Sequence, residues 1–221
     1  MQSSLPHSNT TFGEELASSI THGIGAVLSI VALIVMLVQS VNRGDAWHIV
    51  ACSIFGITLI LAYLASTLYH ALPQPEARAL FRLFDHAAIF LLIAGSYTPF
   101  TMVTLRGPWG WSLFGVIWGL AITGILCEVF VAGRLALVRV AVYIIMGWTM
   151  IIATRPLLDL VATDGLLLLV WGGIAYTAGT IFYAWRRLPY HHAIWHLFVL
   201  TGSGLHVLAI LKYVIPAPLQ G

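Results

Sequence analysis

Two histidines at the start of the last apolar segment, His192 and His196, stand four positions apart. On a helix this spacing points both rings the same way, with Cβ atoms about 6 Å apart, so that two imidazoles can bind one metal ion. His70, at the end of the second apolar segment, could supply a third nitrogen. Ser66 precedes His70 by one turn on the same helix face, where its hydroxyl could support the ligands without binding the ion.

Zinc is the metal that these ligands favour. Imidazole suits zinc, copper, iron and nickel, but the sequence places no Met or Cys near the cluster and contains no evident redox partner. Three nitrogens leave a fourth position for water, as in catalytic zinc sites. Asp85, which opens the third apolar segment, could then act as general base toward that water. In the competing interpretation, these histidines only anchor helix ends at the membrane interface.

The remaining ionisable residues near the spans receive other interpretations. His191 faces about 100° away from the next residue on a helix, which favours an interfacial position. His206 lies about 15 Å beyond the metal pair and is expected to be a buried, hydrogen-bonded residue. Glu128 is expected to pair with a nearby arginine such as Arg134. The roles of His22 and His86 stay open. His7 and His48 are expected to be solvated.

The composition identifies the solvent of this chain as lipid. Of its 221 residues 60% are hydrophobic and only 8% are charged, and the mean hydropathy is +0.95. A soluble domain carries roughly 25% charged residues. The net charge of +2 is too small to predict nucleic-acid binding. Cys52 and Cys127 are expected near opposite faces of the bilayer, so no disulfide is predicted between them.

Membrane-spanning helices need about 20 apolar residues each, and polar or Gly/Pro breaks divide the chain accordingly. A polar tail is expected over residues 1–15, short and disordered, and a single seven-helix domain over residues 16–221. The fourth boundary is weakly marked, so six or eight spans are alternatives. The predicted spans are 17–40, 47–70, 83–104, 111–131, 135–155, 164–185 and 191–214.

The loops predict the orientation of this bundle. Six Lys or Arg residues lie at the second, fourth and sixth loops and four on the other side, which predicts a cytoplasmic N-terminus and an outside C-terminus. With these spans, histidines and carboxylates from distant segments reach one membrane level. Pro99, inside the third span, should kink that helix; the kink could open a cavity or gate, or serve packing alone.

Several motifs, distributed almost end to end, resemble the hemolysin III family, the bacterial branch of the progestin and adipoQ receptor superfamily. The combination of Ser-x3-His, an Asp at the start of the next helix and His-x3-His in the last helix is specific. Ser18 departs from the pattern, which has Asn there. The matching segments are Glu14-Glu15, Thr21-His22-Gly23-Ile24-Gly25, Ala65-Ser66-Thr67-Leu68-Tyr69-His70, Phe84-Asp85-His86, Gly95-Ser96-Tyr97-Thr98-Pro99-Phe100 and His192-Ala193-Ile194-Trp195-His196.

This resemblance implies a seven-helix protein of the bacterial inner membrane with zinc on the cytoplasmic side. The ligands would be His70, His192 and His196, with Asp85 and Ser66 beside them. The superfamily is similar to alkaline ceramidases, which implies a zinc-dependent hydrolase of a lipid amide or ester that acts in membrane-lipid homeostasis. A receptor or sensor with a structural zinc is the second hypothesis. A pore-forming haemolysin is the third, although no charged ring or polar face indicates a conduction path.

Overall fold

The computed structural model describes residues 11–131 and 136–216, and this part of the chain is helical without any strand. Within it, seven helical segments are long and apolar enough to cross a membrane, as the sequence predicts. The third and last spans end in π-helical turns, Phe100–Thr104 and Ile210–Val214, and the fifth span joins α5 and α6 through a 3₁₀ turn, Thr149–Ala153. The α-helices are α1 (Phe12–Arg43), α2 (Ala46–Ala71), α3 (Pro75–Pro99), α4 (Pro108–Val131), α5 (Ala136–Trp148), α6 (Thr154–Leu160), α7 (Thr163–Ala184) and α8 (His191–Ala209).

The first helix starts at Phe12, before the expected residue 17. Its start is set by a capping box, in which the Thr11 side chain accepts from the backbone N–H of Glu14 and the Glu14 carboxylate accepts from the backbone N–H of Thr11. The prediction of a disordered tail over residues 1–15 is therefore wrong for residues 12–15, which are helical. Residues 1–10, where the expected disorder falls, lie outside the described part.

Two further helices are longer than the apolar pattern predicts. α3 begins at Pro75, eight positions before residue 83, because proline is well suited to the first position of a helix and the polar first turns can extend beyond lipid. Pro156 lies in the first turn of α6, where proline is also tolerated, so the fifth span continues to Leu160. The expected loops 71–82 and 156–163 are correspondingly shorter.

The helices differ in how much of their surface faces protein. In an 18-residue apolar stretch of the third span, 67% is buried inside the molecule. The corresponding share is 17% in the spans formed by α4 and by α7. α3 is therefore the central helix, and the exposed side chains of the outer helices, such as Ile24 and Val31 on α1, are apolar surface for lipid. A core around Phe55, Tyr63 and Phe100 joins α2, α3 and the end of the last span.

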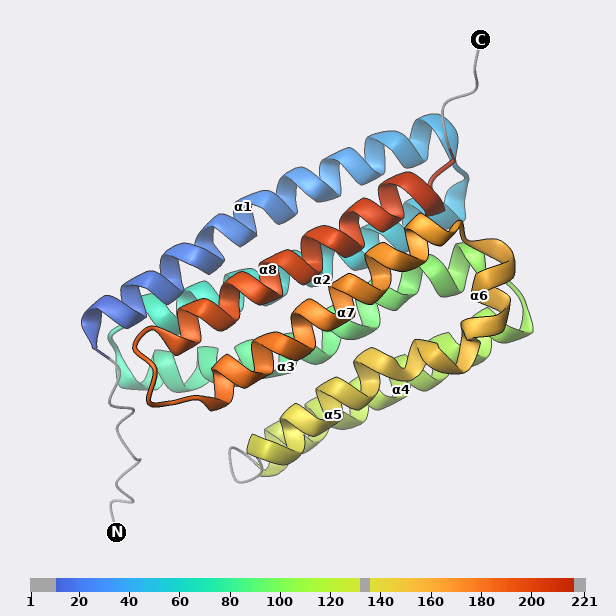
Figure 1. The fold of residues 1–221 in the computed structure, drawn as a ribbon. Coiled ribbons are helices and arrows are strands. Elements are labelled where there is room, and N and C mark those ends of the chain that lie inside the picture. Colours follow the sequence, from blue (N-terminus) through green and yellow to red (C-terminus); the bar gives the residue numbers. More distant parts are fainter. Residues whose placement is uncertain (1–10, 132–135, 217–221) are drawn as a thin grey trace.

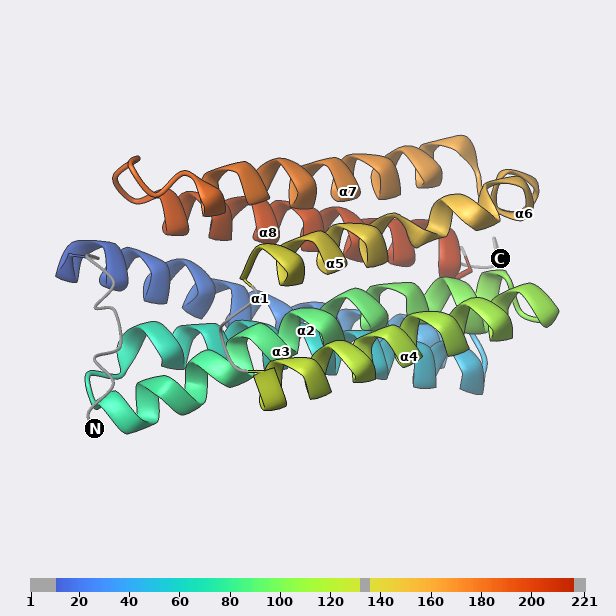
Figure 2. The same ribbon diagram turned by 90° about the horizontal axis from the view of Figure 1, so that it is seen from below.

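Successive membrane-spanning segments run in opposite directions through the bundle. α1, α3 and α8 begin at one end, which is called here the His-cluster end, and the last span finishes at the opposite end (Figure 1). α1 and the neighbouring pair α4 and α5 lie at opposite edges of the bundle in this view. Seen from below, α7 and α8 lie on one side of α5 and α3 and α4 on the other (Figure 2).

Candidate metal centre

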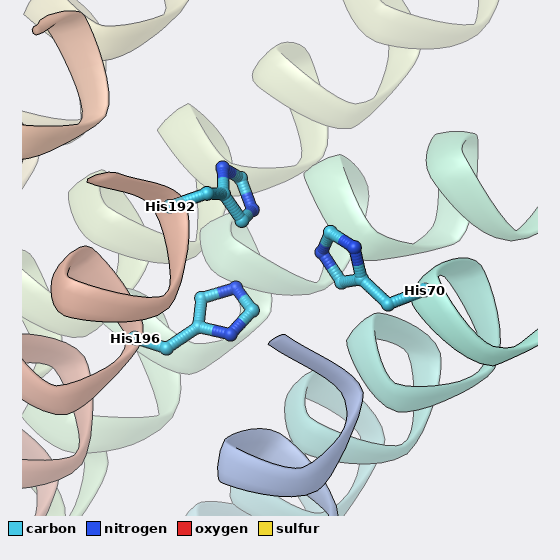
Figure 3. A group of neighbouring side chains, drawn as sticks. All are labelled: His70, His192 and His196. Atoms are coloured by element: carbon cyan, nitrogen blue, oxygen red, sulfur yellow. The ribbon is translucent and has the colours of Figure 1, made fainter. Parts of the chain in front are cut away.

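Three histidines from two helices meet at the His-cluster end. His70 ends α2, and His192 and His196 lie in the first two turns of α8. One ring nitrogen of each lies within 4.8 Å of the others, and the imidazoles point toward one another (Figure 3). The ring centroids are 4.6 Å apart for His192 and His196 and 4.8 Å apart for His70 and His192. The expected convergence of these three residues is confirmed, and together they could hold a metal ion.

The ring of His70 is oriented by an acidic residue of α1. Its Nδ1 lies 2.7 Å from Oε2 of Glu15, so Nδ1–H donates to that carboxylate and Nε2 keeps its lone pair. The other oxygen of Glu15 accepts a hydrogen bond from the Arg78 guanidinium. A carboxylate behind a histidine is the arrangement that holds metal-binding imidazoles in other proteins.

The ring of His196 is oriented by the backbone of α1. Its Nδ1 lies 3.2 Å from the carbonyl oxygen of Ser18 and 3.2 Å from Oγ1 of Thr21, so Nδ1–H is shared between these two acceptors. Because the contact with residue 18 uses a main-chain carbonyl, it does not depend on the side chain. The presence of Ser18 where the family pattern has Asn therefore leaves this support intact.

The donor atoms that face the centre of the cluster have no protein partner. Nε2 of His70, His192 and His196 is buried in each case and makes no hydrogen bond within the described residues. A buried polar atom without a partner costs about 1–3 kcal/mol, and such atoms in folded proteins call for an explanation. For His70 and His196 the tautomer fixed at Nδ1 also leaves Nε2 as a lone-pair donor. The three residues therefore fit a metal ion by the placement of their unpartnered nitrogens.

Asp85 and Ser66 lie beside this cluster without joining it. Asp85, on α3, is only 4% exposed and lines a small cavity together with His192. The Ser66 hydroxyl, one turn before His70 on α2, is fully buried and has no hydrogen-bond partner in the described part of the chain. The structure therefore places both residues next to the cluster.

A second polar cluster joins α3, α4 and α5 next to Asp85. Arg139 donates two hydrogen bonds to the Glu128 carboxylate, at 2.8 and 2.9 Å, and His86 Nδ1 lies 2.9 Å from the same carboxylate. The expected partner Arg134 lies outside the described residues, and the arginine found with Glu128 is Arg139 of α5. His86, whose role the sequence leaves open, is a member of this cluster.

Three other histidines can be placed. His206 donates through Nδ1 to the carbonyl of Gly202 at 2.8 Å, which confirms the expected hydrogen bond. His191 bonds the Phe182 carbonyl of α7 at 3.1 Å instead of turning into the cluster. The expectation that His48 is solvated is wrong, because its side chain is 13% exposed and lies 2.8 Å from the Asp45 carboxylate at the start of α2. His7 lies outside the described residues.

Cys52 and Cys127 are both free, as expected.

Sequence reasoning missed the contribution of α1. With the first span placed at 17–40, Glu15 fell in the tail, although it supports His70 from inside the bundle. His22 was left open, and it stacks on His196 with ring centroids 3.4 Å apart and planes 12° apart. The available signal was the unusual pair of acids immediately before an apolar helix, because ionisable groups at that depth usually have a partner.

A cavity of about 330 Å³ extends from this region into the bundle. It lies between α3, α5, α7 and α8, and representative lining residues are Asp85, Phe100, Tyr143, Leu166, Val199 and His206. The lining also includes Ile151 and Leu158, which are 60% and 62% exposed at the outer surface. The cavity therefore reaches the surface that faces lipid.

Comparison with known proteins supports one family. The family model described as haemolysin-III related matches residues 10–207. Hemolysin-3 of Bacillus cereus is 49% identical over 92% of this chain and 93% of its own length, and the Hemolysin-3 homolog of Bacillus subtilis is 45% identical over 94% and 98%. The human monocyte to macrophage differentiation factor is 28% identical over 93% of this chain and 86% of its own length. With seven spans and these relatives, the chain is a multi-pass protein of the bacterial inner membrane that belongs to the haemolysin-III-related family.

Proposed function

We propose that this protein binds zinc through His70, His192 and His196 and hydrolyses an amide or ester bond of a membrane lipid. The observation that carries the proposal is the convergence of three buried Nε2 atoms that have no partner in the described residues. Three imidazoles, two of them held through Nδ1 by Glu15 and Ser18, form a donor set suited to zinc with a position left open.

The chemistry follows from the groups around the cluster. Zinc in such a site polarises a carbonyl and makes water a better nucleophile at neutral pH. Asp85, buried on α3, accepts the proton of the attacking water and returns it to the leaving group. The Ser66 hydroxyl is buried and makes no hydrogen bond to a described residue, and by donating one to the Asp85 carboxylate it would orient this group.

The cavity supports a lipid as the substrate. Its volume of about 330 Å³ and its mostly apolar lining suit an acyl chain, and Asp85 is one of the lining residues. Because the lining includes side chains at the lipid-facing surface, a lipid can reach the site from within the bilayer. The proposal therefore needs no path through water for the acyl chain.

The same cluster is compatible with a receptor or sensor in which zinc only ties α2 to α8. In this second candidate, the lipid in the cavity shifts the bundle and no bond is broken. A haemolytic pore, which the name of the Bacillus relatives suggests, has less support, because the cavity is lined mainly by apolar side chains.

The test measures metal content and lipid hydrolysis on the same purified preparations in lipid nanodiscs. Asp85→Asn should keep zinc and lower turnover by about 10²- to 10⁴-fold, because it removes the general base and leaves the imidazoles unchanged. His192→Ala should lose both zinc and turnover. His191→Ala is the matched control and should keep both, since its ring bonds α7 outside the cluster.

Unchanged hydrolysis by Asp85→Asn would eliminate the proposed reaction. If zinc removal lowers the melting temperature strongly and extended incubation with bilayer lipids yields no free fatty acid from the wild type, the receptor interpretation replaces it. Zinc bound equally by His192→Ala would eliminate the metal site itself.

A further inference from the structure

His206 lines the cavity deep in the bundle, away from the His-cluster end. It follows His196 by ten positions on α8, which is about 15 Å along the helix. Trp195, Val199 and His206 follow one another at spacings of four and seven positions, so they lie on one face of α8, and all three line the cavity. The cavity therefore has an imidazole in its wall far from the metal cluster.

The ring of His206 is fixed in one tautomer. Its Nδ1 lies 2.8 Å from the carbonyl oxygen of Gly202, and because a carbonyl only accepts, Nδ1 carries the hydrogen. A Cβ built on Gly172 of α7 would lie 2.5 Å from Cε1 and 2.6 Å from Nδ1 of this ring, so the Nδ1–Cε1 edge packs against α7. Nε2 is left as a lone-pair acceptor.

This acceptor has no hydrogen-bond partner among the described residues. The Nε2 atoms of His70, His192 and His196 also lack a partner, but they are fully buried, and Nε2 of His206 is not. The His206 side chain is half-buried and lines the cavity. A group inside the cavity can therefore reach Nε2, and it must donate a hydrogen to bind there.

The hydroxyl groups nearest to His206 are engaged with one another. Tyr63 donates to the Ser203 hydroxyl at 2.7 Å, and the Tyr176 hydroxyl oxygen lies 2.8 Å from the same Ser203 oxygen. The Tyr176 ring packs beside His206 with ring centroids 5.5 Å apart, but its hydroxyl makes no hydrogen bond to the imidazole. The donor for Nε2 therefore has to come from the occupant of the cavity.

We propose that His206 Nε2 forms a second polar subsite, which accepts a hydrogen bond from a hydroxyl group on the acyl chain of the bound lipid. A plain acyl chain has no donor, and a hydroxyl is the simplest donor that it can carry. The separation of about 15 Å from His196 places this hydroxyl in the middle of a long chain and not beside its carbonyl end. The inference rests on the proposed function, because it takes the cavity to hold an acyl chain whose carbonyl end lies at the metal.

The test compares stearic acid with 12-hydroxystearic acid, which differ by one mid-chain hydroxyl. Each competes with a fluorescent fatty acid for purified protein in nanodiscs, and the preference is the ratio of the two dissociation constants. His206→Leu removes the acceptor and keeps an apolar side chain. Its preference for 12-hydroxystearic acid should be about tenfold lower than that of the wild type, the size of effect that one buried hydrogen bond produces. Partitioning into the bilayer cancels, because all proteins are measured in the same nanodiscs.

Three comparisons separate the hydrogen bond from other effects. His206→Gln keeps an acceptor oxygen and should recover part of the preference. His191→Leu removes a histidine that does not line the cavity, so it should keep the wild-type preference. 2-Hydroxystearic acid carries its hydroxyl beside the carboxyl group, so its binding relative to stearic acid should be equal in the wild type and His206→Leu. Should His206→Leu fail to fold, His206→Met, which also lacks a ring nitrogen, takes its place.

An equal preference for 12-hydroxystearic acid in the wild type and His206→Leu would overturn the inference, because Nε2 would then bind a water molecule at most. An equal loss in His191→Leu, or a matching loss for 2-hydroxystearic acid, would overturn it too, since the effect would not belong to this subsite. So would failure of both fatty acids to displace the fluorescent one. Failure of the proposed function is seen separately, as missing zinc or missing lipid hydrolysis in the wild type.

Discussion

At the scale of single residues, the candidate site depends on the atoms behind the ligands as much as on the ligands. Glu15 accepts from His70, and the main chain at Ser18 accepts from His196. Each contact chooses the tautomer that leaves Nε2 free for a metal. Glu15 also contacts the Arg78 guanidinium, so its position is held from two sides. These contacts give α1 a role in metal binding although it contributes no ligand.

Glu15→Gln should therefore weaken zinc binding by about 10- to 100-fold, because the neutral amide supports the His70 ring less well and loses the charge that faces Arg78. Competition with a chromophoric chelator measures the change. Glu14→Gln is the matched control, since Glu14 bonds the main chain of Thr11 and Tyr190 and not the cluster. Equal zinc affinity in wild type and Glu15→Gln, or an equal loss in both variants, would contradict this role.

At the scale of the elements, the site depends on close contact between α2 and α3, which carry His70 and Asp85. The contact is made possible by Gly95 of α3. A Cβ built on Gly95 would lie 2.0 Å from Oγ1 and 2.9 Å from Cβ of Thr58 on α2. Thr58 is itself buried and donates to the Phe55 carbonyl, so it has little freedom to move. Small residues at such crossings are common in membrane bundles for this reason.

Gly95→Ala should destabilise the protein by about 1–3 kcal/mol, because the added methyl group overpacks this crossing. Thermal melting followed by circular dichroism in one detergent measures the loss. Gly119→Ala on α4 is the matched control: no described atom lies within 4 Å of the position that its new methyl group would take, and alanine favours helix, so stability should be unchanged or slightly higher. A melting temperature of Gly95→Ala equal to that of the control would show that α2 and α3 are further apart.

At the scale of the whole molecule, an odd number of spans places the start of α1 and the end of the last span at opposite ends of the bundle (Figure 1). The His cluster lies at the end where α1 starts. The six Lys and Arg residues of the orientation count belong to the predicted loops at this same end, and the other end has four. The positive-inside rule therefore predicts that the proposed metal site faces the cytoplasm.

Single cysteines introduced into a background without Cys52 and Cys127 test this orientation in intact bacteria. Pro189→Cys, in the exposed loop before α8, should resist a membrane-impermeant maleimide until the cells are permeabilised. Asp159→Cys, exposed at the opposite end, should be labelled in intact cells. The reverse pattern would place the N-terminus and the metal site outside.

The sequence by itself determined the membrane class, the seven spans and the three histidines of the cluster. These features depend on apolar length and on the i, i+4 spacing, both of which are local properties of the chain. The first residues of α1 and α3 were not predicted. Both helices begin before the apolar boundary, α1 after its cap at Thr11 and α3 at Pro75. Only the tertiary structure decided what surrounds the cluster: Glu15 behind His70, His22 stacked on His196, and Arg139 beside Glu128. Those pairings join different helices, and their partners are selected by the packing of the bundle, which no local pattern encodes.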